Sequence, residues 1–291
     1  MSKKVGYIFS LFILLAFSLD AKSILYKVSS KTSTVYVLGS VHLAKAELYP
    51  LAKEIENAYS KSDTLVVELD PSSAESTEVI LNTMQTSGMY EEGKTLQTEL
   101  TPKTYKVLQD YTSSSGIPLD MMEQMRPWVV MLQLTVAELM RLGYSPDMGI
   151  DKHFLDDAKL TNKRVLELET AQSQMDLLSK NNKEFQDKLL LYTLESMKEL
   201  EPMIDDMFNS WINGDAEGFN KIMAIPEGTE QGVKDIYDSL ITKRNYKMTD
   251  KVEQFLKTRN NYFVVVGAGH VVGKEGIVAL LKKRGYKVTQ H

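Results

Sequence analysis

Short apolar runs alternate with segments of helical periodicity along most of this chain. Residues 24–28 and 34–38 are predicted to form two short strands, and the polar segment between them favours a hairpin. After Pro50, apolar residues recur at helical spacing as far as Ser60, and the run 64–70 predicts another strand. The order strand, helix, strand is that of a βαβ unit, whose crossover we expect to be right-handed.

The same alternation recurs towards the C-terminus. Residues 149–158 have a helical pattern and precede a strand-like run at 164–169. Near the end of the chain, a predicted strand at 263–266 is followed by a helix at 276–283 and a last strand at 286–289. We therefore expect an α/β fold with a mixed, largely parallel central sheet that is built from βαβ units.

Long helical stretches separate these units. Apolar residues recur three and four positions apart in residues 73–112, 127–142, 172–201, 203–213, 230–242 and 247–258. No Pro-rich linker or low-complexity tract marks a boundary. The pattern predicts a single α/β domain over residues 22–291, with helical insertions at about 71–148 and 171–260 that cover one edge of the sheet.

The N-terminus has the pattern of a secretory signal peptide. Two lysines precede an apolar stretch over residues 5–19, and small and polar residues follow. We expect residues 1–21 to be removed, with cleavage after Ala21 favoured over cleavage after Ser18. An uncleaved anchor is the alternative, although the stretch is short for a spanning helix. The protein is thus predicted to be exported, periplasmic or secreted, and to meet the membrane only through this segment if it is kept.

Composition excludes several classes of protein. The 291 residues include no cysteine, which excludes disulfides, a thiol nucleophile and thiolate metal ligands. The formal net charge is −5 and the two signs are interspersed. Because the only basic run is at 282–284, nucleic acid is not expected as a partner.

Two matching segments near opposite ends of the chain carry the main functional signal. Residues 35–42 (VYVLGSVH) and 263–270 (FVVVGAGH) each have an apolar run, a glycine and, three positions later, a histidine. His42 and His270 are two of only four histidines. Because open α/β sheets bind ligands beyond the carboxyl ends of their strands, neighbouring strands would bring both imidazoles into one cleft. A structural, hydrogen-bonded role for each histidine is the alternative.

The glycines of these segments have a physical reason. We expect Gly39 and Gly267 to permit a positive φ and a close backbone approach where the chain leaves the sheet. The turn at Gly267 and Gly269 also exposes backbone N–H groups. Gly39, Gly267 and Gly269 are therefore candidates for an oxyanion or anion site.

Three carboxylates are candidates to join the histidines. Glu68 lies in an apolar strand, where an unpaired carboxylate is costly, so it needs a cation, a metal ion or a proton. A glutamate on an exposed edge strand is the alternative. Glu169 and Asp70 lie at the ends of predicted strands, where a site role and a turn or helix-cap role are both open.

Two arginines are candidate ligands for anions. Arg126 precedes Pro127 and Trp128 at a predicted helix start, and Arg244 lies in the segment KRN at 243–245. A guanidinium binds carboxylates and oxyanions through paired hydrogen bonds. The alternatives are a stacked surface pair for Arg126 and a solvated charge for Arg244.

Methionine is frequent, with 15 residues, of which five lie at 121–140 and two at 203–207. Core filling is the simpler interpretation. The sharper hypothesis is an adaptable apolar groove for peptides or lipid-like chains.

Taken in order, these motifs resemble the TraB/GumN family, and most closely its GumN-like bacterial branch. The similarity covers about residues 24–290. The matching segments are VLGSVHL at 37–43, ELYP at 47–50, VVELD at 66–70, MRPW at 125–128, GIDKHF at 149–154, LET at 168–170, RN at 244–245 and GAGHVVG at 267–273.

The resemblance implies a fold related to the erythromycin esterase and ChaN-like proteins. The family includes Tiki proteins, which resemble metal-dependent proteases acting on secreted Wnt, and pheromone-shutdown proteins of bacterial plasmids. By resemblance, family function falls on His42, His270, Glu68, and Arg126 or Arg244.

We therefore expect a metal-dependent hydrolase, most of all a peptidase with a peptide or protein substrate. His42, His270 and Glu68 would bind a divalent ion such as Zn, Mn or Co. A second carboxylate, Glu169 or Asp70, would act as general base.

Two other functions stay open. The first is a metal-independent esterase in which one histidine is the base. The second is a non-catalytic exported protein that sequesters a peptide or glycan in the methionine-rich groove.

Overall fold

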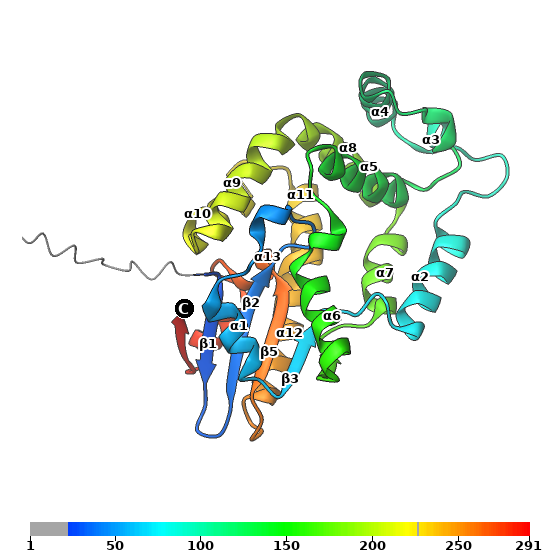
Figure 1. Cartoon of the computed structure of the whole chain (residues 1–291). Coiled ribbons are helices and arrows are strands. Elements are labelled where there is room, and N and C mark those ends of the chain that lie inside the picture. Colours follow the sequence, from blue (N-terminus) through cyan, green and yellow to red (C-terminus); the bar gives the residue numbers. More distant parts are fainter. Residues whose placement is uncertain (1–22, 226) are drawn as a thin grey trace, which may run out of the picture.

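The computed structural model describes residues 23–225 and 227–291, so the predicted signal segment lies outside the described residues. At its centre is a six-stranded sheet of order β4-β3-β5-β2-β1-β6 (Figure 1). The strands are β1 (Leu25–Ser29), β2 (Thr34–Ser40), β3 (Thr64–Val67), β4 (Arg164–Glu167), β5 (Tyr262–Gly267) and β6 (Lys287–Gln290).

The sheet is mixed and largely parallel, as the sequence predicted. β2, β3, β4 and β5 run parallel, whereas β1 pairs antiparallel with β2 and with β6. β2 and β5 are neighbours, and Ser40 is paired with Gly267 in their register. This pairing brings the two histidine-bearing segments, from opposite ends of the chain, together at the carboxyl ends of two neighbouring inner strands.

Helices cover both faces of the sheet (Figure 1). α1 (Lys53–Ser60) and α6 (Ile150–Thr161) pack on one face, while α12 (Lys243–Phe255) and α14 (Ile277–Lys283) lie on the other. Their apolar residues and the strands form one buried core, in which the side chains of β5 from Phe263 to Val266 are fully buried. Burial on both faces explains why the strands are continuous apolar runs.

The remaining helices gather beyond the carboxyl ends of the parallel strands (Figure 1). They are α2 (Ala74–Ser87), α3 (Leu96–Glu99), α4 (Pro102–Ser115), α5 (Pro127–Arg141), α7 (Ala171–Ser179), α8 (Lys183–Ser196), α9 (Leu200–Ile212), α10 (Ala216–Met223), α11 (Gln231–Tyr237) and α13 (Ala268–Val271). Short 3₁₀ turns lie at Ala46–Leu48, Leu119–Met121, Pro146–Met148 and Met197–Glu199, and a π-helical turn lies at Asp238–Thr242. Part of this group has its own hydrophobic cluster around Leu108, Leu134 and Leu190.

Two predicted helical stretches are wrong as continuous helices. The stretch at 73–112 is divided because α2 stops before Gly88, and α4 begins anew with Thr101 as N-cap and Pro102 in its first turn. The stretch at 172–201 is divided where Asn182 caps α8. β3 and β4 also end earlier than predicted, so Glu68 directly follows β3 and Glu169 lies two residues beyond the end of β4. Within the described parts of the chain, no helix has the length and apolarity that crossing a membrane requires.

Candidate functional site

A cavity of about 360 Å³ lies beyond the carboxyl ends of β2 and β5. One side is polar and is lined by Ser40, His42, Arg244 and His270. Most of the rest of the lining is apolar and comes from α5, α9, α10 and the π-helical turn. The expectation that both histidines share one cleft is therefore met.

His42 is held by a carboxylate from a distant helix. Its Nδ1 lies 2.9 Å from Oδ2 of Asp151, and Oδ1 of Asp151 accepts a 2.8 Å hydrogen bond from the Ser40 hydroxyl. The His42 side chain is 61% exposed, towards the cavity. Asp151 beside it raises the pKa of His42 to about 9, so the ring is an imidazolium at neutral pH when nothing else binds it.

The first turn of α6 positions Asp151. The Ile150 N–H donates to the Val41 carbonyl at 3.0 Å, which docks the helix start on the histidine loop. A Cβ on Gly149 would collide with the carbonyl oxygen of His42, so this contact requires glycine. Burial by itself would raise the pKa of the Asp151 carboxyl, but the His42 charge and hydrogen bonds from His42 and Ser40 hold it below its usual range.

His270 is buried and oriented by an amide. Its Nδ1 lies 2.6 Å from Oδ1 of Asn245, whose own NH₂ donates to the Glu275 carbonyl at 2.9 Å. Because that second bond fixes the orientation of the amide, Nδ1 of His270 carries the proton and Nε2 keeps its lone pair. Burial lowers the pKa of His270 to about 4, so its ring is neutral at neutral pH.

Arg244 joins two buried carboxylates. It donates to Glu68 Oε2 at 2.6 Å and to Glu169 through Nε at 3.0 Å and through a terminal nitrogen at 2.6 Å. Its other terminal nitrogen donates to the Leu240 carbonyl in the π-helical turn at 3.0 Å. Burial alone would raise the pKa of Glu169, and the Arg244 guanidinium brings it below its usual range. The sequence predicted that a buried Glu68 needs a cation, a metal ion or a proton, and in the structure Arg244 is a cation paired with it.

The histidines and Glu68 converge at Gly267. The Gly267 N–H donates to Glu68 Oε1 at 2.6 Å. A Cβ built on Gly267 would stand 3.4 Å from Glu68 Oε1, 3.5 Å from His42 Nε2 and 3.7 Å from His270 Cδ2. Glu68 Oε1 also lies 3.9 Å from His270 Nε2. Side chains that follow β2, β3 and β5 therefore bound one small space, which glycine leaves open.

The predicted reasons for glycine at positions 39 and 267 are only partly confirmed. Gly267 has a φ of −49°, and Gly39 is not among the glycines with positive φ, so the expected left-handed backbone is wrong. Close approach is confirmed, since a Cβ on Gly39 would lie 2.7 Å from Ile24 Cγ2 and 3.0 Å from the Cα of Ala268. The N–H groups of Gly39 and Gly267 donate to the Ile24 carbonyl and to Glu68, while Gly269 lines the cavity.

Glu68, Glu169 and Gly39 are not part of the cavity lining but contact residues that are, whereas Arg126 and Asp70 make their contacts elsewhere. Arg126 donates through Nε to the Met89 carbonyl at 3.3 Å, and its guanidinium lies 5.6 Å from the centre of the Tyr90 ring. Asp70 accepts a 3.0 Å hydrogen bond from the Ser72 N–H, which is a local turn contact.

Sequence reasoning missed Ser40, Asp151 and Asn245, although each lies inside or beside a motif segment. Asp151 was the third residue of GIDKHF and Asn245 the second residue of the RN pair, so their inclusion in those segments was the available signal.

The atoms that could hold a metal ion are Nε2 of His42, Nε2 of His270 and Oε1 of Glu68. In both imidazole rings Nδ1 is hydrogen-bonded to an oxygen atom, which leaves Nε2 to bind an ion. Two such nitrogens and a carboxylate make a donor set that suits divalent transition metals. The side chains of residues 23–225 and 227–291 do not, as they stand, form a group of three or more metal-binding residues. The donors fit chemically, but a bound ion would have to draw them together.

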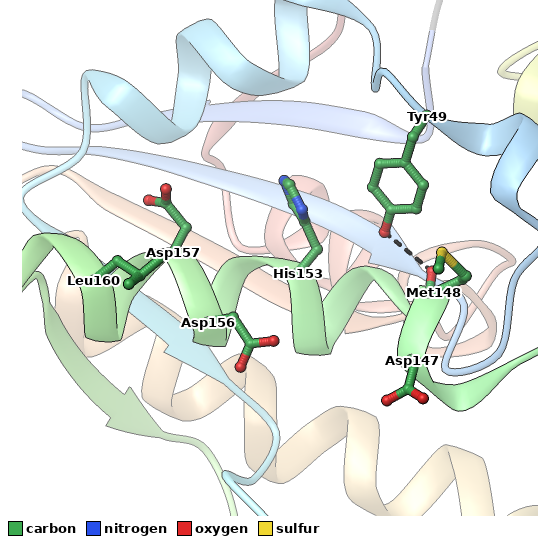
Figure 2. Close-up of a pocket in the computed structure, with 7 residues that line it drawn as sticks. All are labelled: Tyr49, Asp147, Met148, His153, Asp156, Asp157 and Leu160. Carbon is green, nitrogen blue, oxygen red and sulfur yellow. Dashed lines mark hydrogen bonds between the residues drawn. The ribbon is translucent and has the colours of Figure 1, made fainter.

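A second cavity, of about 330 Å³, lies along the outer side of α6 (Figure 2). Its polar residues do not converge on one point, since His153 projects from one side of the helix segment while Asp147 and Asp156 point to the other, and Tyr49 comes from a separate loop. Tyr49 donates to the Met148 carbonyl at 3.0 Å, and His153 lies 3.4 Å from Glu56. These contacts are structural.

Comparison with known proteins gives relatives over most of the chain. An uncharacterized protein, YbaP, of Escherichia coli (strain K12) is 25% identical over 250 residues, which cover 85% of this chain and 87% of YbaP. An uncharacterized protein of Treponema pallidum is 21% identical over 279 residues, 89% of this chain and 80% of its own length. A metalloprotease TIKI homolog of the sponge Amphimedon queenslandica is 33% identical over 57 residues, only 19% of this chain and 11% of that protein.

No solved structure matches the chain significantly. The model of the TraB/PrgY/gumN family matches residues 24–290, which span the whole sheet and every group of the histidine site. The chain therefore belongs to the TraB/PrgY/gumN family.

Proposed function

We propose that this protein is a metal-dependent hydrolase, most of all a peptidase, whose active site is the cavity at the ends of β2 and β5. One observation carries the proposal. Both histidines bind oxygen acceptors through Nδ1, and the space at Gly267 is bounded by His42 Nε2, by the His270 ring and by Glu68 Oε1. Metal-binding histidines are held by such partners in many enzymes.

A divalent ion such as Zn, Mn or Co would be held by His42, His270 and Glu68. When bound, it would supply a Lewis acid and a water of lowered pKa. The local similarity to a protein named as a metalloprotease supports this chemistry. Metal binding requires His42 to lose the proton that Asp151 favours, so affinity should rise with pH.

The other polar residues of the site orient His42, His270 and Glu68 or pair with them. Asp151 orients the His42 ring, and Asn245 keeps the Nε2 lone pair of His270 available. Arg244 pairs with Glu68 and Glu169 in a buried place, with 8% of each carboxylate side chain exposed, and it lowers the pKa of Glu169. Glu68 is the carboxylate beside the histidines, so we assign it the role of ligand or proton acceptor. Glu169 has its oxygens bound by Arg244 and Gln174 and serves to position Arg244.

A metal-independent esterase is less well supported. With pKa values of about 9 and about 4, His42 is protonated at neutral pH and His270 is only weakly basic, so neither pKa is matched to a general base at that pH. A non-catalytic peptide-binding protein is the second candidate, and the apolar side of the cavity favours it.

The test combines metal content with peptide cleavage. We would purify the protein without chelator, measure bound metals, and titrate Zn, Mn and Co into wild type and into His42→Ala and His270→Ala. A peptide library would then be screened by mass spectrometry with each metal. The proposal expects metal-dependent cleavage that both variants lose, and a His153→Ala control that keeps it. Folded protein that neither binds metal nor cleaves any peptide would rule it out.

We also propose that residues 1–21 direct export and are removed. Fractionation of cells and N-terminal sequencing of the mature protein test this. A mature protein that begins at residue 22 in the exported fraction is expected, whereas an intact N-terminus in the cytoplasmic fraction would contradict it.

A further inference from the structure

The histidine site faces an apolar surface that the proposed chemistry does not use. Six side chains form most of this apolar wall: Leu139 of α5, Ile204, Met207 and Phe208 of α9, Met223 of α10, and Ile241 of the π-helical turn. Hydrolysis of a peptide bond needs the polar side alone. Apolar side chains around the same cavity favour substrates with an apolar group beside the scissile bond, because burying an apolar group is favourable and a buried polar group would lack a hydrogen-bond partner.

The wall reaches the turn that carries His270. A Cβ on Gly269 would lie 3.1 Å from the Cε methyl of Met223, so this methionine lies directly over the GAGH turn. Any group seated against Met223 is therefore adjacent to the histidine site. Methionine is unbranched and adapts its shape, so this wall would accept apolar side chains of several sizes.

The apolar surface continues outside the cavity along α5. Leu132 and Val136 lie seven and three residues before Leu139, so the three side chains share one face of the helix. Leu132 is 38% exposed and Val136 is 37% exposed, and Met140 beside them is 56% exposed. This stripe extends about 10 Å from Leu139 along the helix.

The two apolar surfaces fit an extended peptide. An extended peptide rises about 3.3 Å per residue and its side chains alternate between two faces, so side chains two residues apart point to the same side and lie about 7 Å apart, within the length of the stripe. We propose, resting on the proposed function, that the substrates are polypeptides with an apolar side chain next to the scissile bond and a second apolar residue two positions away. The cavity wall binds the first side chain and the α5 stripe binds the second.

Binding can be measured without turnover. With methionine methyl groups labelled with ¹³C and with chelator present, we would titrate acetyl-Ala-Leu-Ala-Leu-Ala-amide and a matched probe with Ser in place of Leu. The methyl signals of Met207 and Met223 should shift with the Leu peptide, and that of Met140 should follow. The signal of Met121, which is 72% exposed on another part of the surface, should stay in place.

Two variants test the wall directly. Met207→Gln and Met223→Gln keep the length of the side chain and should weaken Leu-peptide binding about tenfold. Met121→Gln is the matched control and should bind like wild type. Circular dichroism melts show whether each variant is folded. If one of the two variants does not fold, the other still tests the wall.

The outcomes separate this inference from the proposed function. Leu-peptide binding without cleavage under any metal would leave the apolar site standing and overturn the hydrolase. Equal cleavage of Leu and Ser peptides, or methyl shifts that spread equally to Met121, would overturn the apolar site and leave the hydrolase standing. Octanamide tests an acyl chain as the occupant: if it shifts Met207 and Met223 while the Leu peptide does not, the peptide assignment is wrong.

Discussion

Nδ1 of His42 lies 2.9 Å from Oδ2 of Asp151, although 109 positions separate the two residues in the chain. The pair ties the end of β2 to the first turn of α6, and the Ser40 hydroxyl completes the set of contacts to the carboxylate. It defines which nitrogen of His42 faces the cavity. Four consequences of this architecture can be measured.

Replacing Asp151 should change the protonation of His42. In Asp151→Asn the carboxylate charge is lost, so the pKa of His42 should fall from about 9 towards the ordinary value of 6.5. Metal affinity and any metal-dependent activity should fall about 10- to 100-fold as the ring loses its orientation. NMR titration of the histidine ring protons measures the first effect. Asp156→Asn is the control, since Asp156 pairs with Lys152 on the surface, and a His42 pKa that stays near 9 in Asp151→Asn would contradict the assignment.

His270 should make the metal-free protein less stable in mild acid. Its pKa in the folded state is about 4, below the value of 6.5 for an ordinary histidine, so the unfolded chain binds more protons between those pH values. The contribution of neutral His270 is fully present above pH 6.5 and is lost as pH falls towards 4, by at most about 3 kcal/mol. Urea unfolding with chelator, at steps from pH 7.5 to 4.5, measures the slope. His270→Gln should flatten it and His291→Gln should not; parallel curves for all three proteins would refute the prediction.

Arg244 should contribute far more to stability than Arg284, although each pairs with two carboxylates. Arg244 is 15% exposed and its partners are 8% exposed, so Arg244→Ala would leave two buried charges unpaired, at a cost of about 3–5 kcal/mol. Arg284 pairs with Asp250 and Glu253, and the Asp250 side chain is 62% exposed. Arg284→Ala should cost about 1 kcal/mol or less. Chemical unfolding compares the two, and equal losses would show that the Arg244 cluster is not desolvated as described.

Gly149 should be needed to keep His42 in place. A Cβ there meets the backbone carbonyl of His42, which cannot yield like a flexible side chain, so Gly149→Ala should cost about 1–3 kcal/mol. Metal binding should weaken with it. In Gly232→Ala the new methyl meets only the flexible end of Lys188, so this helical position is the control and should be nearly neutral. Unfolding in urea and metal titration of both variants measure the difference; a stable Gly149→Ala with unchanged metal affinity would contradict the contact.

The polar site was only partly predictable from the sequence. The repeated GxxH context located His42 and His270, and the cost of burying a carboxylate identified Glu68 as a residue that needs a partner. Arg244 was one of two arginines that could have been that partner, and nothing local distinguished it from Arg126. The structure separates them, because Arg244 follows a π-helical turn beside the cavity while Arg126 begins α5 against Met89.

Local patterns along the chain were enough for the α/β class, the hairpin, the strands and most of the helices, because apolar periodicity and turn residues act over a few positions. They were also enough to mark both histidines. Only the folded chain decided which polar groups meet, since Arg244 and Glu68 lie 176 positions apart and His42 and Asp151 lie 109 apart. Such pairs form because the strand order β3-β5-β2 brings three strand ends together and burial forces each charge there to find a partner.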